Sequence, residues 1–221
     1  VGDDPTGEMV RALASADGLE VDLSMDTAHD SGLTVVAEDQ GYERSFLSSL
    51  GAMGRFGPDD VPGEALEARF VLCSGYFLLP GMQGEATGSL LAEARRHGAV
   101  TAADTGHPDG GWYENELTGS TGIEDIEKAA QHLAARFGTT VVAKLGADGA
   151  LLCTEGRVIR ADAPRVDPVD TTGAGDSFNA AFLAALHRGE RAEDALATAV
   201  RTASELVATA PEERAAVLRG A

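Results

Sequence analysis

The chain has 221 residues, of which 43% are hydrophobic and 24% are charged; this composition is that of an ordinary globular domain and excludes a disordered chain. Its 17 basic against 36 acidic residues give a net charge of −19, which argues against the basic face needed to bind nucleic acid or an anionic membrane surface. No apolar run approaches the ~18 residues of a membrane span, and Cys73 and Cys153 lie in apolar runs typical of reduced core residues. We expect a cytoplasmic protein that binds neither nucleic acid nor membrane.

The first part of the chain predicts a short helix followed by a small β element. Residues 8–16 have the apolar spacing of a helix. Residues 32–38 and 43–47 alternate apolar and polar side chains around the turn signal Asp39-Gln40-Gly41. We expect these two strands to form a β element separate from the main sheet.

From residue 70 on, apolar strands alternate with helices. The predicted strands are 70–77, 99–104, 140–145 and 150–154, and the predicted helices are 87–97, 123–137, 177–187 and 192–207. Asp148-Gly149 predicts a hairpin between the last two strands. Strands that alternate with helices favour a parallel sheet covered by helices on both faces. Residues 104–116 break this pattern, because they lack the apolar strand expected between two helices.

The most informative segment is Gly173-Ala174-Gly175-Asp176 at the start of an alanine-rich helix. Small residues let an anion approach the unpaired N–H groups and the positive end of a helix. A carboxylate beside such an anion site suits a base that deprotonates a hydroxyl nucleophile during phosphoryl transfer. A capped helix after a glycine turn, with Asp176 as a favourable first-turn acid, explains the same spacing without any catalysis.

Residues 170–178, Asp-Thr-Thr-Gly-Ala-Gly-Asp-Ser-Phe, resemble the C-terminal signature of the ribokinase-like (PfkB) family of sugar and nucleoside kinases. Further resemblances follow the family's order: residues 1–7 are similar to its VGDDxxG stretch, 31–36 and 41–46 to its lid strands, and 142–150 to its KxGxxG hairpin. The resemblance implies one domain over residues 1–221. It implies a three-layer α/β/α sandwich with a mainly parallel sheet and a small β lid at about residues 31–52.

The resemblance also implies an ATP-dependent kinase that phosphorylates a hydroxymethyl group of a sugar or sugar-like substrate. Asp176 would be the catalytic base, and Gly173, Ala174 and Gly175 would form the anion hole. The residues near ATP would be Lys144, Gly146 and Gly149. Glu116 would act on the Mg²⁺–phosphate network, and Asp170 and Thr172 match positions where many members bind a monovalent cation such as K⁺. In many relatives, the lids of two subunits cover each other, which implies a homodimer.

The sequence departs from the family pattern at three places, one of which is the family's final nucleotide loop, shortened near residues 203–211. The family's first strand and its GGxxxN motif do not precede Val1, and residues 113–119 resemble only the tail of its N-x-x-E motif, with Tyr113 in place of Asn and Glu116 as the matching Glu. We expect the complete molecule to carry further residues before Val1 and between about Gly110 and Glu114.

Two other functions remain open on the sequence. A nucleoside kinase of the same family would differ in the N-terminal substrate motifs. A non-catalytic regulator that binds a sugar or nucleotide would share the fold, although the retained Asp176 argues against it. A dinucleotide-binding oxidoreductase is disfavoured, because no G-x-G-x-x-G opens a helix after a strand.

Overall fold

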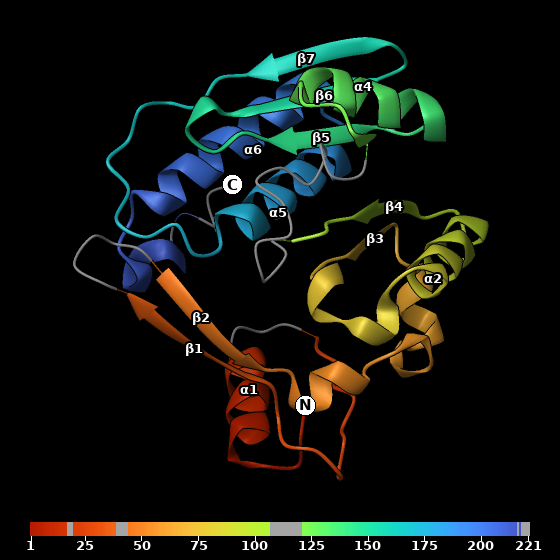
Figure 1. Ribbon diagram of the computed structural model, residues 1–221, viewed down its shortest axis with the longest axis vertical. Helices are drawn as coiled ribbons and strands as arrows, with labels where there is room; N and C mark the ends of the chain where they lie inside the picture. Colours follow the sequence, from red (N-terminus) through yellow and green to blue (C-terminus); the bar gives the residue numbers. More distant parts are fainter. Residues whose placement is uncertain (17–19, 39–43, 107–120, 216, 218–221) are drawn as a thin grey trace. The chain divides into compact units, whose positions relative to one another are not determined.

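The computed structural model describes residues 1–16, 20–38, 44–106, 121–215 and 217. The chain divides into two compact units, Val1–Gly110 and Gly111–Ala221. The first unit runs from red to yellow-green and the second from green to blue in Figure 1. The predicted single domain stays a prediction, and each unit is described by itself.

The first unit begins with helix α1 (Pro5–Ala16), which starts slightly earlier than predicted. Strands β1 (Leu33–Glu38) and β2 (Arg44–Ser49) pair antiparallel, with Leu33 opposite Ser49. They form a sheet of their own, which confirms the predicted separate β element. The turn predicted at residues 39–41 lies outside the described residues.

The same unit contains a parallel strand pair joined through a helix. Strand β3 (Phe70–Cys73) pairs with β4 (Val100–Ala103), and helix α2 (Glu85–Arg96) lies between them in the chain. The prediction of one strand over residues 70–77 was too long. Gly75 adopts a left-handed conformation (φ +74°) and Tyr76–Leu78 form a turn of 3₁₀-helix, so the extended backbone ends at Cys73.

The second unit is built on a three-stranded antiparallel meander. Strands β5 (Val141–Lys144) and β6 (Ala150–Thr154) form the predicted hairpin. Strand β7 (Arg157–Ala161) extends it and was not predicted. The remaining helices of this unit are α4 (Ile126–Phe137), α5 (Ala174–His187) and α6 (Ala192–Val207).

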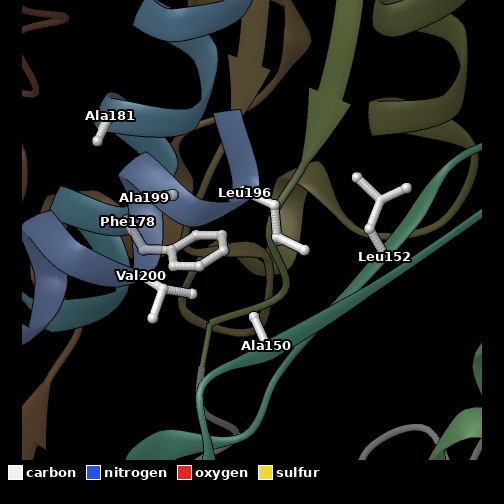
Figure 2. Packing of buried hydrophobic residues seen from close by; sticks show 7 residues of the cluster. All are labelled: Ala150, Leu152, Phe178, Ala181, Leu196, Ala199 and Val200. Atoms are coloured by element: carbon white, nitrogen blue, oxygen red, sulfur yellow. The ribbon is translucent and has the colours of Figure 1, made fainter. Parts of the chain in front are cut away.

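Strand β6 is buried on both faces, which makes this unit a three-layer arrangement. Successive residues of a strand point to opposite faces of the sheet. Ala150 and Leu152 pack with Phe178 of α5 and Leu196 of α6 (Figure 2). On the opposite face, the packed residues are Leu151 and Cys153 of β6, Ala143 of β5, and Ala130 and Ala134 of α4. The sheet therefore has α4 on one side and the α5–α6 pair on the other.

The cysteines and the Gly138 end of α4 agree with the sequence, whereas α4 begins at Ile126 and not at the predicted residue 123. Cys73 and Cys153 are both free thiols, and burial raises the pKa of the Cys153 thiol, which keeps it protonated and inert. Asp125 caps α4 by accepting a hydrogen bond from the Lys128 N–H at 3.1 Å, and Gly138 ends this helix with φ +59°.

In the part of the chain that the structure describes, no helix has the length and apolar character needed to cross a bilayer.

Candidate active site

The start of helix α5 presents two backbone N–H groups that have no acceptor among the described residues. Gly173 precedes the helix with φ +78°, a conformation that glycine adopts at little cost. The Ala174 N–H donates to the Thr171 carbonyl (3.2 Å) and the Ser177 N–H to the Gly173 carbonyl (2.9 Å). The N–H groups of Gly175 and Asp176 find no acceptor among the described residues. These two amides, at the positive end of the helix dipole, are a ready anion site.

Lys144 lies beside this helix start. It is the last residue of β5, and its Nζ donates to the Gly175 carbonyl at 3.2 Å. The same Nζ lies 5.5 Å from the centroid of the Phe178 ring, within the range of a cation–π contact. The structure thus brings together two residues that are 31 positions apart in the sequence, and it places a positive charge next to the free amides.

Asp176 projects from the first turn of α5 and is exposed. Its carboxylate has no ion-pair or hydrogen-bond partner in the described ranges. An acid at this position is stabilised by the helix dipole, and it remains available to accept a proton from a bound hydroxyl group. The site therefore combines a proton acceptor with anion-binding amides within one helical turn.

The segment that leads into α5 is held by Arg214, which sequence reasoning missed. Oδ1 of Asp170 accepts hydrogen bonds from the N–H (3.0 Å) and the Oγ1 (2.8 Å) of Thr172. The guanidinium of Arg214 donates to the carbonyl oxygens of Asp170 (2.5 Å) and Thr172 (2.8 Å). Nothing in the local sequence around Arg214 signals this contact, because it depends on the tertiary packing of the segment after α6.

The two glycines of the hairpin differ in what they do. Gly149 is buried with φ +91°, and a Cβ atom on it would lie 2.0 Å from the Ala161 carbonyl oxygen. Gly146 has φ +60°, and a Cβ atom there would meet no atom within 4 Å. Close packing of the backbone thus explains the glycine at 149, whereas the surroundings of Gly146 leave room for a ligand.

The remaining predicted site residue, Glu116, lies outside the described residues. Within the described ranges, no group of three or more His, Cys, Asp or Glu side chains could hold a metal ion. The amides of Gly175 and Asp176 fit a phosphate group at the α5 start.

Comparisons with known proteins agree with this geometry. Residues 113–211 match the family model described as "pfkB family carbohydrate kinase". The 1-phosphofructokinase of Haloferax volcanii is 36% identical, over 92% of this chain and 71% of that protein. The aminoimidazole riboside kinase of Salmonella typhimurium is 30% identical, over 89% of this chain and 69% of that protein. The chain belongs to the PfkB family of carbohydrate kinases.

A solved structure confirms the fold. The putative ribokinase II of E. coli, determined in complex with ATP and Mg²⁺, superposes with a TM-score of 0.80 at 19% identity, over 100% of this chain and 82% of that chain. The predicted α/β ribokinase-like fold is therefore correct. Family membership likewise confirms the predicted class of function, a sugar or nucleoside kinase.

Proposed function

We propose that this kinase transfers the γ-phosphoryl group of ATP to a hydroxymethyl group of a sugar or sugar-like substrate. The observation that carries the proposal is the pair of unpaired amides at Gly175 and Asp176, next to the Asp176 carboxylate. Phosphoryl transfer needs mainly positioning and stabilisation of charge, and this helix start supplies both. ATP and Mg²⁺ as co-substrates are supported by their presence in the E. coli structure.

Each residue at the helix start has a separate role in this reaction. Asp176 accepts the proton of the attacking hydroxyl group. The backbone of Gly173, Ala174 and Gly175 forms the anion hole, in which the N–H of Gly175 and that of Asp176 donate to the phosphoryl oxygens. Lys144 lies 3.2 Å from the Gly175 carbonyl and adds a positive charge at the same turn. Gly146 leaves open space on the nucleotide side of the hairpin, where Gly149 sets the backbone.

Mg²⁺ would neutralise the phosphates of the nucleotide, and Glu116 is the residue that we propose acts on it. The described residues contribute no acidic cluster to this task. The proton transfer assigned to Asp176 and the amide contacts stand independently of that metal.

The proposed substrate class follows from the family description and from the relatives. The family is described as carbohydrate kinases, and the H. volcanii relative is named 1-phosphofructokinase. A nucleoside kinase remains the second candidate, because the Salmonella relative is named for a riboside. A non-catalytic regulator is the third candidate, and the loss of turnover in the experiment below would exclude it.

The β1–β2 sheet is proposed as a lid that also mediates a homodimer. Three of its apolar side chains are strongly exposed: Leu33 (59%), Val35 (55%) and Leu47 (77%). Exposed apolar side chains on a two-stranded sheet mark an interaction surface, and the free edges of such a sheet invite pairing with another chain. A second copy of the chain would cover both features.

A monovalent cation at Asp170 and Thr172 stays a prediction. The structure bears on it through Arg214, whose guanidinium already contacts the carbonyl oxygens of both residues. A K⁺ ion would compete with this side chain for the same oxygen atoms.

The test of the proposed function is Asp176→Asn, with Asp194→Asn as the matched control. Both acids are exposed and lie in the first turn of a helix of this unit, so both substitutions remove one charge from a helix dipole. We expect Asp176→Asn to lower turnover by ~10²–10⁴-fold, since it removes the general base. The KM for ATP should change little or fall, because a negative charge near the phosphates is lost.

Steady-state kinetics with a panel of sugars and nucleosides gives both parameters and identifies the substrate. Asp194→Asn should retain normal turnover. If folded Asp176→Asn kept turnover within a few-fold of the wild type, Asp176 would be only a helix-stabilising acid and the mechanism would be wrong.

A further inference from the structure

Arg214 places one positive charge inside a shell of oxygen atoms. Its Nε donates to the Thr209 carbonyl (3.1 Å), Nη1 to the Thr172 carbonyl (2.8 Å) and Nη2 to the Asp170 carbonyl (2.5 Å). Nη1 also lies 3.3 Å from Oδ2 of Asp170. Three carbonyl oxygens and one carboxylate oxygen therefore surround a single guanidinium group.

This shell joins two segments that are distant in the sequence. Asp170 and Thr172 lie just before α5, whereas Thr209 lies just after α6. The N–H groups of Val169 and Asp170 both donate to the Val207 carbonyl, at 2.7 and 3.2 Å. The fold thus fixes the oxygen atoms, and the guanidinium links them across the junction.

The ion pair in this shell is largely shielded from solvent. The side chain of Arg214 is 13% exposed and that of Asp170 is 22% exposed. Charges in such surroundings are screened far less by dissolved salt than surface charges are. A guanidinium also stays protonated throughout the pH range in which proteins are folded. The positive charge at this position is therefore permanent and does not depend on the ionic composition of the solution.

We propose that Arg214 is an internal cation that takes the place of a bound monovalent ion and positions the catalytic helix start. Carbonyl and carboxylate oxygens are the ligands that hard metal cations select. Here the same oxygens accept hydrogen bonds from a guanidinium that is covalently part of the chain. By holding residues 170–172, Arg214 fixes the turn that aims the amides of Gly175 and Asp176. This inference rests on the proposed function, in which those amides bind the transferred phosphoryl group. It makes the kinase independent of K⁺.

The first test uses the unmodified protein. Turnover is measured in KCl, NaCl and choline chloride at equal ionic strength, because general screening alone would affect a protein of net charge −19. We expect equal turnover in the three salts. Activation by K⁺ of several-fold over both controls would overturn the proposal and support a bound monovalent cation instead.

The second test compares Arg214→Ala with Arg201→Ala. Arg201 is an exposed arginine of α6 whose Nη2 donates to Thr198 Oγ1 at 3.3 Å, so its loss controls for the change in net charge. In choline chloride, Arg214→Ala should lose about 10–100-fold in turnover, the scale expected for a misplaced catalytic group, and Arg201→Ala should lose none. K⁺ should restore part of the loss only in Arg214→Ala, because the emptied oxygen shell can then accept an ion.

Melting temperature gives a readout that needs no substrate. A ligand that binds only the folded state raises the melting temperature, so K⁺ relative to choline should raise it for Arg214→Ala and leave the other two proteins unchanged. If the wild type phosphorylated no substrate, the proposed function would be wrong. The melting temperatures would still show whether Arg214→Ala binds an ion that the wild type does not bind. Two results for a folded Arg214→Ala would overturn the proposal. The first is turnover in choline chloride equal to that of the wild type. The second is a loss of turnover that K⁺ does not restore, together with a melting temperature that K⁺ does not raise. If that variant does not fold, the salt comparison on the wild type decides alone.

Discussion

Substitution of Gly149 by alanine tests whether the hairpin beside the active site depends on close backbone packing. A Cβ atom at this position would lie 2.0 Å from the Ala161 carbonyl oxygen and 2.7 Å from the Ala163 N. Since both neighbours are backbone atoms, they can make room only if the end of β7 and the residues after it move. The positive φ of Gly149, +91°, adds strain for any residue with a Cβ atom.

The magnitude follows from these two contributions. The backbone conformation costs roughly 1–2 kcal/mol for an L-residue, and forcing an extra methyl group into a packed site costs about 1–3 kcal/mol. Gly149→Ala should therefore lower the free energy of unfolding by about 2–5 kcal/mol, a large part of the ~5–15 kcal/mol of a typical domain. For a chain of this size, the melting temperature should fall by roughly 4–20 °C.

Gly146→Ala is the matched control, because it lies in the same turn. Gly146 has a positive φ of +60°, but a Cβ atom there would meet nothing within 4 Å. Only the conformational cost of roughly 1–2 kcal/mol applies to it. Thermal unfolding followed by circular dichroism measures both variants. Equal melting temperatures for the two variants would refute the packing argument, since the clash with the backbone of Ala161 and Ala163 applies to Gly149 and not to Gly146.

Two further predictions concern the first unit. The Asp4 carboxylate accepts hydrogen bonds from the N–H of Ser31 and from that of Gly7, and these bonds lower the pKa of Asp4 in the folded state. A carboxylate with a lowered pKa stabilises the fold above its unfolded pKa. This stability is lost as the pH falls through the folded pKa. Asp4→Asn should flatten this acid limb when urea unfolding is measured across pH 2–6, and an unchanged limb would exclude Asp4 as its source. Leu33→Ser should weaken self-association in sedimentation experiments while leaving the melting temperature of the monomer unchanged, because Leu33 is 59% exposed; an unaltered dimer would contradict the proposed role of the lid.

The parts of the fold that sequence reasoning found are those with strong local signals. Helix α6 was predicted with its observed ends, 192 and 207, because its apolar residues recur with helical spacing. The end of α4 follows from Gly138, a residue with direct capping chemistry. Its start was predicted three residues too early, at 123, because the cap at Asp125 was not recognised. The β5–β6 hairpin follows from Asp148-Gly149. In each case, the decisive interaction lies within a few residues of the chain.

Strand β7 was missed because its signal is weak. Positions 157 and 160 of this strand are arginines, so its apolar run is short. The turn that precedes the strand contains Glu155 with φ +47°, a conformation that non-glycine residues rarely adopt. Arg160 is exposed and forms an ion pair with Glu127 of α4 at 2.5 Å. The strand is stabilised by pairing with β6 and by the packing of Ile159 against the α5–α6 core, and both are tertiary effects.

The candidate site divides in the same way. The motif around Asp176 was found because glycines and an acid directly before a helix carry a local chemical meaning. The contact of Lys144 with Gly175 follows only from the fold, and so do the bonds of Arg214 to Asp170 and Thr172. A single sequence contains no signal for the pairing of residues 42 positions apart.

The electrostatics of the site reconcile a net charge of −19 with an anionic co-substrate. Lys144 and Arg214 carry two positive charges, and Asp170 and Asp176 carry two negative charges, so these four side chains cancel. The attraction for phosphate must then come from the amides of Gly175 and Asp176 and from the α5 dipole, which amounts to about half a unit charge. Repulsion from more distant acids is screened beyond ~8–10 Å.

This balance gives the two principal substitutions opposite effects on ATP binding. Asp176→Asn leaves the four-residue set with a net positive charge, so ATP should bind as well as before or better while the chemical step fails. Arg214→Ala leaves it negative and loosens the turn that carries the amides, so the KM for ATP should rise as turnover falls. A base and a positioning cation both lower the rate when they are removed, and the sign of the change in KM distinguishes them.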